Sequence, residues 1–361
     1  MIKGNKGEWS EFYAFLKILS DKKLFDADED LNQLRDKFHV VLQIIKDEAR
    51  YGKKIYDISE GKDTIKIMNK DGDIIKIIDD SLIKSKIKEL FSEMKNSKDT
   101  TFSIELGEKL MKEVDCNQIK ACSASKADLV VVVHDKMSPV LPKLGFSIKS
   151  MLGSPATLLN PGKTTNFIYK IENAPNNLED INKIETTAKV KDRIHAILNA
   201  GGKLVFKEMT NTTFKGNLRK IDTILPDIVA EMLKVFYSGE AATIADVLNR
   251  IGGDEDLKLR FDLTKNNLAY KIKEFLIAIA LGMTPSHEWD GTMSAQGGYL
   301  IVKEDGEIVC YHLYNRDAFK DYLFDNTKME TASTTRYEFA KIYKENGEFY
   351  IKLNLQIRFI K

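Results

Sequence analysis

Residues 126–150, KADLVVVVHDKMSPVLPKLGFSIKS, contain two short apolar runs joined by a loop with two prolines. The valine run at 130–133 is typical of a central strand that is covered on both faces. In the second run apolar and polar residues alternate, so a strand there turns Ser147 and Lys149 to one face and the residue between them to the other. If the two strands pair as a hairpin, Asp128 and Lys149 meet at one end of a sheet.

Asp128 and Lys149 carry chemistry that suits phosphodiester hydrolysis. Aspartate is a poor strand residue, so its place beside the valine run indicates another requirement. A carboxylate binds a hard divalent cation through oxygen, and the cation stabilises charge on a phosphate. The lysine can orient or deprotonate the attacking water and offset the developing negative charge. Two structural alternatives stay open: Asp128 as a cap of a turn at a strand end, and Lys149 as a solvated edge lysine.

The second carboxylate of such a site normally lies two residues before the lysine, where this chain has Ser147. A helix predicted over 7–19 offers a replacement. At about 100° per residue, Glu8 falls near the middle of its apolar stripe and Glu11 near the edge. A buried carboxylate is costly without a cation or donor, and a metal shared with Asp128 would supply one. The alternative is that Glu8 is a first-turn residue that interacts with the helix dipole.

The apolar spacing along the rest of the chain predicts a mixture of helices and strands, and therefore an α/β (α+β) fold. Several of the expected helices stop at glycine, and the turns EDGE and ENGE each separate two apolar strands near the C-terminus. We predict helices at 7–19, 80–96 and 104–114, strands and turns at 37–78, a mostly helical segment at 178–282, and hairpins at 298–314 and 337–359.

The composition is that of an ordinary folded protein. The chain has 361 residues, and 43% of them are hydrophobic, which is ample for a sizeable core. No apolar run approaches the roughly 18 residues of a membrane helix, and MIKGNKGEW lacks the apolar core of a signal peptide. We therefore expect a soluble cytoplasmic protein. The net charge of +1 neither requires nor excludes nucleic acid as a partner.

The cysteines and histidines favour neither a zinc module nor a histidine nucleophile. Cys116, Cys122 and Cys310 are an odd set without CxxC spacing, which also argues against a disulfide framework. The five histidines show no HxxxH or HExxH pairing, and the chain lacks the glycine-rich loops that bind ATP or dinucleotides.

The ordered motifs resemble the core of the PD-(D/E)XK nucleases, and in particular the HpaII-type type II restriction endonucleases. The resemblance extends over almost the whole chain and is carried by NKGEWSE, SKADLVVV followed by GFSIKSMLGSPATLLN, TNFIY, STTRYEF and LNLQIRF. It implies a mixed sheet flanked by helices, with further helical and β-rich regions for DNA recognition. It also implies Mg²⁺-dependent cleavage of double-stranded DNA, with Mn²⁺ as a substitute metal, at a short palindromic site, CCGG.

Within this resemblance, Asp128 corresponds to the metal-binding aspartate and Lys149 to the catalytic lysine. Ser147 occupies the place of the usual second acid, and the proline of the core pattern is also absent. Related restriction enzymes carry a Ser-x-Lys version and recruit the acid from elsewhere. We therefore assign the second metal ligand to Glu8, with Glu11 next.

Polar side chains in four segments are candidates for DNA contacts. Small hydroxyl and amide groups meet phosphates, and arginine paired with guanine is the commonest specific base contact. Each segment has a plainer alternative, as a turn-rich connector or as a surface or salt-bridged residue. The candidates are Ser150, Ser154, Asn160, Thr164, Thr165, Asn166, Gln296, Asn326, Lys328, Arg336 and Arg358.

The resemblance also predicts the organisation of the chain and its partners. The predicted regions are a nuclease core with the N-terminal helix and a β-meander at 1–175, a mainly helical region at 176–285, and a β-rich region at 286–361. A palindromic site is most simply read by a homodimer, although a monomer that nicks sequentially is the alternative. A cognate DNA methyltransferase is expected in the same system, though not as a stable subunit.

Two other functions stay open. Because Ser147 replaces an acid, the chain is alternatively a catalytically inactive, sequence-specific DNA-binding protein. The other alternative is a nuclease that reads modified DNA.

Overall fold

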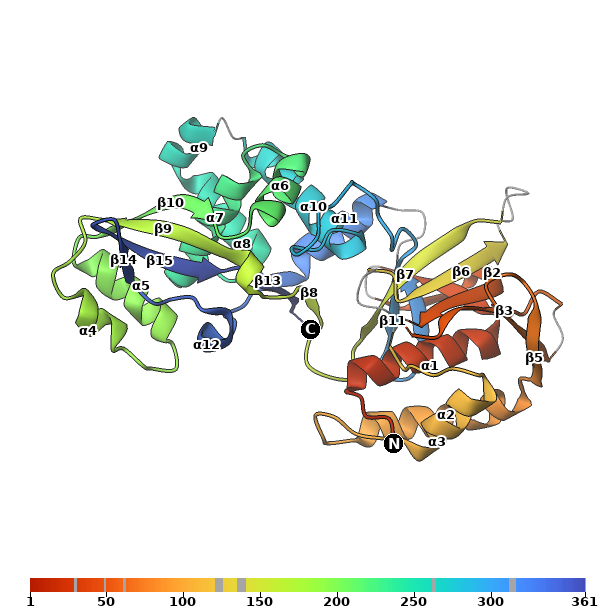
Figure 1. Cartoon of the computed structure of the whole chain (residues 1–361). Coiled ribbons are helices and arrows are strands. Elements are labelled where there is room, and N and C mark those ends of the chain that lie inside the picture. Colours follow the sequence, from red (N-terminus) through yellow and green to blue (C-terminus); the bar gives the residue numbers. More distant parts are fainter. Residues whose placement is uncertain are drawn as a thin grey trace. The chain divides into compact units, whose positions relative to one another are not determined.

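The computed structural model covers the whole chain and describes residues 1–28, 31–48, 50–60, 63–120, 126–134, 141–261, 264–311 and 316–360. The chain divides into two units (Figure 1). Unit 1 comprises Met1–Ala156 and Met293–Phe319, and unit 2 comprises Thr157–Thr292 and Lys320–Ile360. Cys122 and His312 lie outside the described residues. No helix among the described residues is long and apolar enough to cross a membrane.

Unit 1 is built on a mixed sheet. Among the described residues, nine strands form it in the order β1-β12-β11-β7-β6-β2-β3-β4-β5. The pairs β7–β11 and β1–β12 are parallel, and the other neighbours are antiparallel. The strands are β1 (Lys23–Ala27), β2 (Gln33–Glu48), β3 (Gly52–Asp57), β4 (Thr64–Met68), β5 (Ile74–Asp79), β6 (Leu129–His134), β7 (Lys143–Ser150), β11 (Gly298–Val302) and β12 (Ile308–Tyr311).

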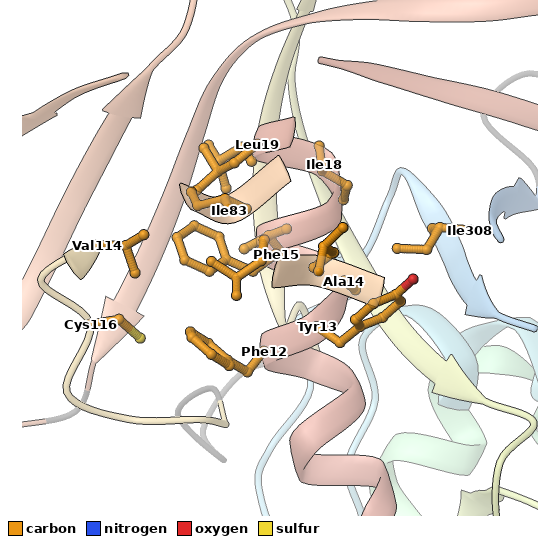
Figure 2. Packing of buried hydrophobic residues seen from close by; sticks show 14 of the residues in the cluster. Phe12, Tyr13, Ala14, Phe15, Ile18, Leu19, Ile83, Val114, Cys116 and Ile308 are labelled. Carbon is orange, nitrogen blue, oxygen red and sulfur yellow. The ribbon is translucent and has the colours of Figure 1, made fainter. Parts of the chain in front are cut away.

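Helix α1 (Lys6–Asp21) packs on this sheet and forms much of the core of unit 1. Its apolar residues recur at helical spacing, and Phe12 and Phe15 are fully buried. Figure 2 shows both rings on the side of α1 that faces Val114 and Cys116. Helices α2 (Ser81–Asn96) and α3 (Glu105–Glu113) belong to the same unit. The helix predicted over 7–19 is confirmed.

Unit 2 combines helices with two smaller sheets. In its described part, the sheets have the orders β10-β9-β15-β14 and β13-β16-β8. The strands are β8 (Thr157–Leu159), β9 (Asn166–Glu172), β10 (Lys203–Met209), β13 (Thr327–Met329), β14 (Tyr343–Glu345), β15 (Glu348–Asn354) and β16 (Ile357–Phe359). The helices are α4 (Leu178–Asn182), α5 (Lys189–Asn199), α6 (Thr212–Ile221), α7 (Leu225–Tyr237), α8 (Ile244–Gly253), α9 (Glu255–Phe261), α10 (Lys265–Leu281) and α12 (Thr334–Tyr337), with a 3₁₀ turn at Lys163–Thr165.

The mixed α+β architecture predicted from the sequence is confirmed, with local corrections. The hairpins around EDGE and ENGE are present as β11–β12 and β14–β15. The prediction that 178–282 is mostly helical is confirmed, and the strand β10 lies within this range and pairs with β9, which precedes it in the chain. A helix, α11 (Arg316–Asp325), and the short α12 interrupt the C-terminal region that we predicted as β-rich. Local spacing missed β10 because its alternation is short and lies between helices.

Candidate active site

The pairing of β6 with β7 brings Asp128 and Lys149 to the same end of the sheet. The strands are antiparallel, with Leu129 opposite Phe146. One residue before β6, the backbone N–H of Asp128 donates to the carbonyl of Phe146 over 2.8 Å and extends the ladder. The hairpin geometry expected from the sequence is therefore present.

Ser147 joins the two charged side chains through its hydroxyl. Nζ of Lys149 donates to Oγ of Ser147 over 3.0 Å, and this hydroxyl donates to Oδ2 of Asp128 over 3.1 Å. The backbone N–H of Ile148 also donates to Oδ2, over 2.7 Å. Among the described residues, Oδ1 of Asp128 makes no hydrogen bond, so one carboxylate oxygen remains open to a cation.

Lys149 is half-buried and lies close to charged and hydroxyl side chains. Burial lowers the pKa of its ammonium group from the ordinary value, while the negative charges of Asp128 and Glu11 act in the opposite direction. Its Nζ lies 5.0 Å from the ring centre of Tyr299, which β11 places beside Ser147. The ring face and the two carboxylates together favour a cation at this place.

Lys126 is a second lysine at the site, and the sequence reasoning gave it no role. Burial and the positive charge of Lys149 together lower the pKa of its ammonium group to about 8, against the opposing charge of Asp128. Its backbone N–H donates to Oγ of Ser294 over 3.2 Å. The signal was the i, i+2 spacing of Lys126 and Asp128, which puts both side chains on one side of an extended chain.

Glu8 and Glu11, the two candidate acids on α1, have different surroundings. Oε1 of Glu8 accepts from Nζ of Lys120 over 2.8 Å, and Oε2 accepts from the backbone N–H of Asn5 over 3.0 Å, which completes a capping box. Burial raises the pKa of Glu8, but the bonds from Lys120 and Asn5 lower it more, so the net shift is downward. Both oxygens of Glu8 are therefore engaged, and it is the charge of Glu11 that acts on Lys149.

The donor set for a metal at this site is small. In the part of the chain that the structure describes, no group of three or more His, Cys, Asp or Glu side chains is arranged to hold a metal ion.

The candidate DNA contacts are divided between the two units. Ser150, Ser154 and Gln296 belong to unit 1, and the others belong to unit 2. The hydroxyl of Ser10 donates to Oγ of Ser150 over 2.8 Å. Side chains that are exposed and so accessible to DNA are Ser154, Asn160, Gln296, Asn326 and Arg336.

Three of the candidates in unit 2 hold that unit together. Thr165 and Asn166 are buried, and Nδ2 of Asn354 donates to Oδ1 of Asn166 over 2.7 Å. Arg358 is paired with Glu330 at 3.1 Å. Thr164 and Lys328 are half-buried. The side chains of Thr165, Asn166 and Arg358 therefore already have partners inside unit 2.

Known proteins match this sequence over nearly its whole length. The sequence model of the family described as HpaII restriction endonuclease matches residues 5–359. The chain is 41% identical over 358 residues to the type II restriction enzyme HpaII of Haemophilus parainfluenzae, with 99% of this chain and 98% of the relative covered. No solved structure matches. The chain therefore belongs to the HpaII restriction endonuclease family.

Proposed function

We propose that this protein is a type II restriction endonuclease that hydrolyses phosphodiester bonds in both strands of double-stranded DNA at a short palindromic site, CCGG. The observation that carries the proposal is the hydrogen-bonded series from Lys149 through Ser147 to Asp128, at one end of the sheet. Membership of the HpaII restriction endonuclease family supports it. The arrangement corresponds to a PD-(D/E)XK centre in which the second acid comes from α1.

Asp128 and Glu11 would hold the divalent cation, Mg²⁺ or its substitute Mn²⁺. Asp128 offers the open Oδ1, and the charge of Glu11 reaches Lys149. We prefer Glu11 to Glu8 because the charge of Glu11 acts on Lys149, which lies beside Asp128. When bound, the cation stabilises negative charge on the phosphate and activates water.

The side chains of this chain supply the remaining steps. Lys149 orients the attacking water through its ammonium protons, and Ser147 keeps that ammonium directed toward Asp128. Lys126 adds a second positive charge that offsets charge on the phosphate as the bond breaks. The ring of Tyr299 covers one side of Lys149 and excludes water there, which strengthens these electrostatic effects.

A homodimer on DNA matches the two-fold symmetry of a palindromic site, with one active site for each strand. The system then includes a DNA methyltransferase that protects the host genome and acts separately. A monomer that nicks the two strands in turn would give open-circular plasmid before linear plasmid.

The binding-only alternative rests on one observation, the serine that stands in place of an acid. One experiment separates it from cleavage. Purified protein is incubated with unmethylated plasmid and Mg²⁺, beside Lys149→Ala and a matched control, Lys143→Ala, which removes an exposed lysine at the other end of β7. Discrete fragments from the parent and the control alone support the proposal. Binding without cutting under Mg²⁺ and Mn²⁺ would overturn it, and cutting that requires base modification would favour the modified-DNA alternative.

A further inference from the structure

Unit 2 contains a cavity of about 800 Å³ that lies wholly within it. Its walls are the start of α5, the end of α7 with the turn that follows, and residues 331–335. The last of these directly precede Arg336, which we predicted to contact DNA. Sites for small molecules have volumes of roughly 300–1,000 Å³, so this cavity accommodates more than a lone phosphate.

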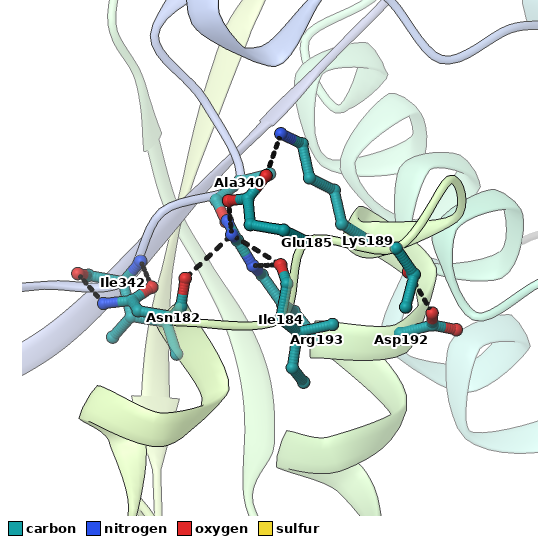
Figure 3. A network of polar contacts seen from close by, with 9 residues as sticks. Asn182, Ile184, Glu185, Lys189, Asp192, Arg193, Ala340 and Ile342 are labelled. Carbon is teal, nitrogen blue, oxygen red and sulfur yellow. Dashed lines mark hydrogen bonds and ion pairs between the residues drawn. The ribbon is translucent and has the colours of Figure 1, made fainter.

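The walls of the cavity are fixed by bonds that need no ligand. Oη of Tyr237 donates to the carbonyl of Asn354 over 3.0 Å, and the N–H of Met329 donates to the carbonyl of Ala242 over 2.8 Å. Arg193 of α5 donates to the carbonyl of Ala340 over 2.8 Å, as Figure 3 shows. The cavity is therefore preformed, as ligand sites usually are.

The lining of the cavity contains lysines but no carboxylate. It contains two lysines and several hydroxyl side chains but neither Asp nor Glu. The carboxylate of Glu185, outside the lining, pairs with Lys189 at 2.7 Å (Figure 3). Lys191 makes no ion pair with any described residue, so its positive charge is uncompensated. The lining hydroxyls belong to Thr187, Thr331, Ser333, Thr334 and Thr335.

Gly239 allows Lys191 to lie against the wall. Its φ is +76°, and a Cβ built there would lie 2.0 Å from Cε and 2.1 Å from Nζ of Lys191. The positive φ favours glycine at this position, and the absence of a Cβ leaves room for the end of the lysine side chain. Phe236, half-buried in the same lining, adds an aromatic ring. An uncompensated ammonium, hydroxyl donors and an aromatic ring together suit a nucleotide, which is an anion attached to a flat base.

We propose that this cavity binds a nucleotide unit, with its phosphate beside Lys191 and its base against Phe236. The inference rests on the proposed function and deepens it. The same chemistry has two sources: a nucleotide that leaves the stack of the bound DNA, or a free nucleoside monophosphate. Unstacking a base costs a few kcal/mol, which a specific pocket can offset.

The test uses the full chain without divalent metal and has two arms. In one, dCMP and dGMP are titrated separately by calorimetry. In the other, the fluorescence of a duplex with 2-aminopurine at or beside CCGG is followed, since this base brightens when it unstacks. Lys191→Gln removes the cation, and Ala188→Glu places a carboxylate in the lining. The matched controls are Lys203→Gln, at an exposed lysine outside the lining, and Ala188→Gln, which adds the same bulk without charge.

We expect binding in at least one arm, weakened about tenfold by Lys191→Gln, because a charge-assisted hydrogen bond is lost. Ala188→Glu weakens it as well, and the two controls leave it unchanged. A calorimetric signal with dCMP or dGMP, without a fluorescence rise, identifies a free nucleotide as the ligand. A fluorescence rise without a calorimetric signal identifies a nucleotide of the bound DNA as the ligand. Ala188 is exposed at the N-terminus of α5, where an acid is favourable, so Ala188→Glu should fold normally.

Two results would overturn the inference: no signal in either arm from a parent that cleaves plasmid, or equal affinities in the parent and both test variants. Plasmid cleavage is measured on the same preparations to keep the two proposals separate. A parent that binds dCMP or dGMP at Lys191 but never cleaves DNA contradicts the proposed function alone.

Discussion

Ser147 donates its hydroxyl proton to Oδ2 of Asp128 over 3.1 Å. The PD-(D/E)XK nuclease core normally has its second acid at the position of Ser147. The same hydroxyl accepts a proton from Lys149, so the serine couples the two charged groups instead of adding a third charge. This arrangement leaves the second metal ligand to come from outside β7.

Ser147→Ala should slow DNA cleavage by about tenfold, because Lys149 and Asp128 lose the hydroxyl that orients both, and a hydrogen bond of this kind contributes about 1–1.5 kcal/mol. Single-turnover cleavage of a short duplex measures the effect. The affinity for the duplex should change little. A variant that cleaves at the parental rate would show that the serine only fills space.

Lys126→Met should lower cleavage and at the same time raise the free energy of unfolding, by about 1 kcal/mol, because it removes a buried charge that Lys149 repels. If Lys126 had a purely structural role, its replacement would instead lower the free energy of unfolding. Urea unfolding of the parent and the variant, compared with single-turnover rates, distinguishes the two. Lower stability with normal cleavage would contradict a place for Lys126 in the site.

Glu11→Gln should reduce cleavage by at least about 100-fold, because the proposed role of Glu11 is that of a direct metal ligand. Loss of a group that only supports such a ligand already costs about 10–100-fold. Glu8→Gln should cleave within about threefold of the parent but lose about 1 kcal/mol of stability, because the capping box is broken. Cleavage rates over a Mg²⁺ titration test both. The reverse ranking would return the ligand role to Glu8.

Glu48 should make unfolding depend on pH in the acid range. Burial raises its pKa, but the charge of Lys46 and bonds from Cys116 and Asn117 lower it more, so the folded pKa lies below the ordinary 4.5. The stabilisation is therefore complete above pH 4.5 and is lost as the pH falls through the folded pKa. Glu48→Gln leaves Lys46 buried without its ionic partner and should cost about 3 kcal/mol at pH 7.

Unfolding free energies measured between pH 7 and pH 3 test this prediction. The difference between the parent and Glu48→Gln should narrow once the pH falls below 4.5. A constant difference over this range would mean that the pKa of Glu48 is the same in the folded and unfolded states.

Local patterns in the sequence were sufficient for the strand pair and for α1. The valine run and the alternation around Ser147 required neighbouring antiparallel strands, and the turn residues marked the later hairpins. The parallel insertion of β11 beside β7 was not predictable in this way, because it pairs residues about 150 apart in sequence and depends on burial of the whole sheet. For the same reason no sequence signal placed Tyr299 over Lys149.

The choice between Glu8 and Glu11 shows a second limit of prediction from the sequence. A helical wheel measures angle alone, and it gave Glu8 the more inward direction. Asn5 followed three residues later by Glu8 is a capping-box spacing, and this signal was present in the sequence. The wheel missed it because a first-turn side chain bends back toward the residues that precede the helix, where Glu8 contacts Asn5.

The central claim is most directly tested by mapping where the protein cuts. Unmethylated plasmid is digested with the parent and with Lys149→Ala in Mg²⁺, and the fragment ends are sequenced. We predict that every end from the parent falls within CCGG and that Lys149→Ala yields no fragments while still binding the DNA. Ends at unrelated sequences, or parental activity that survives in Lys149→Ala, would contradict the account.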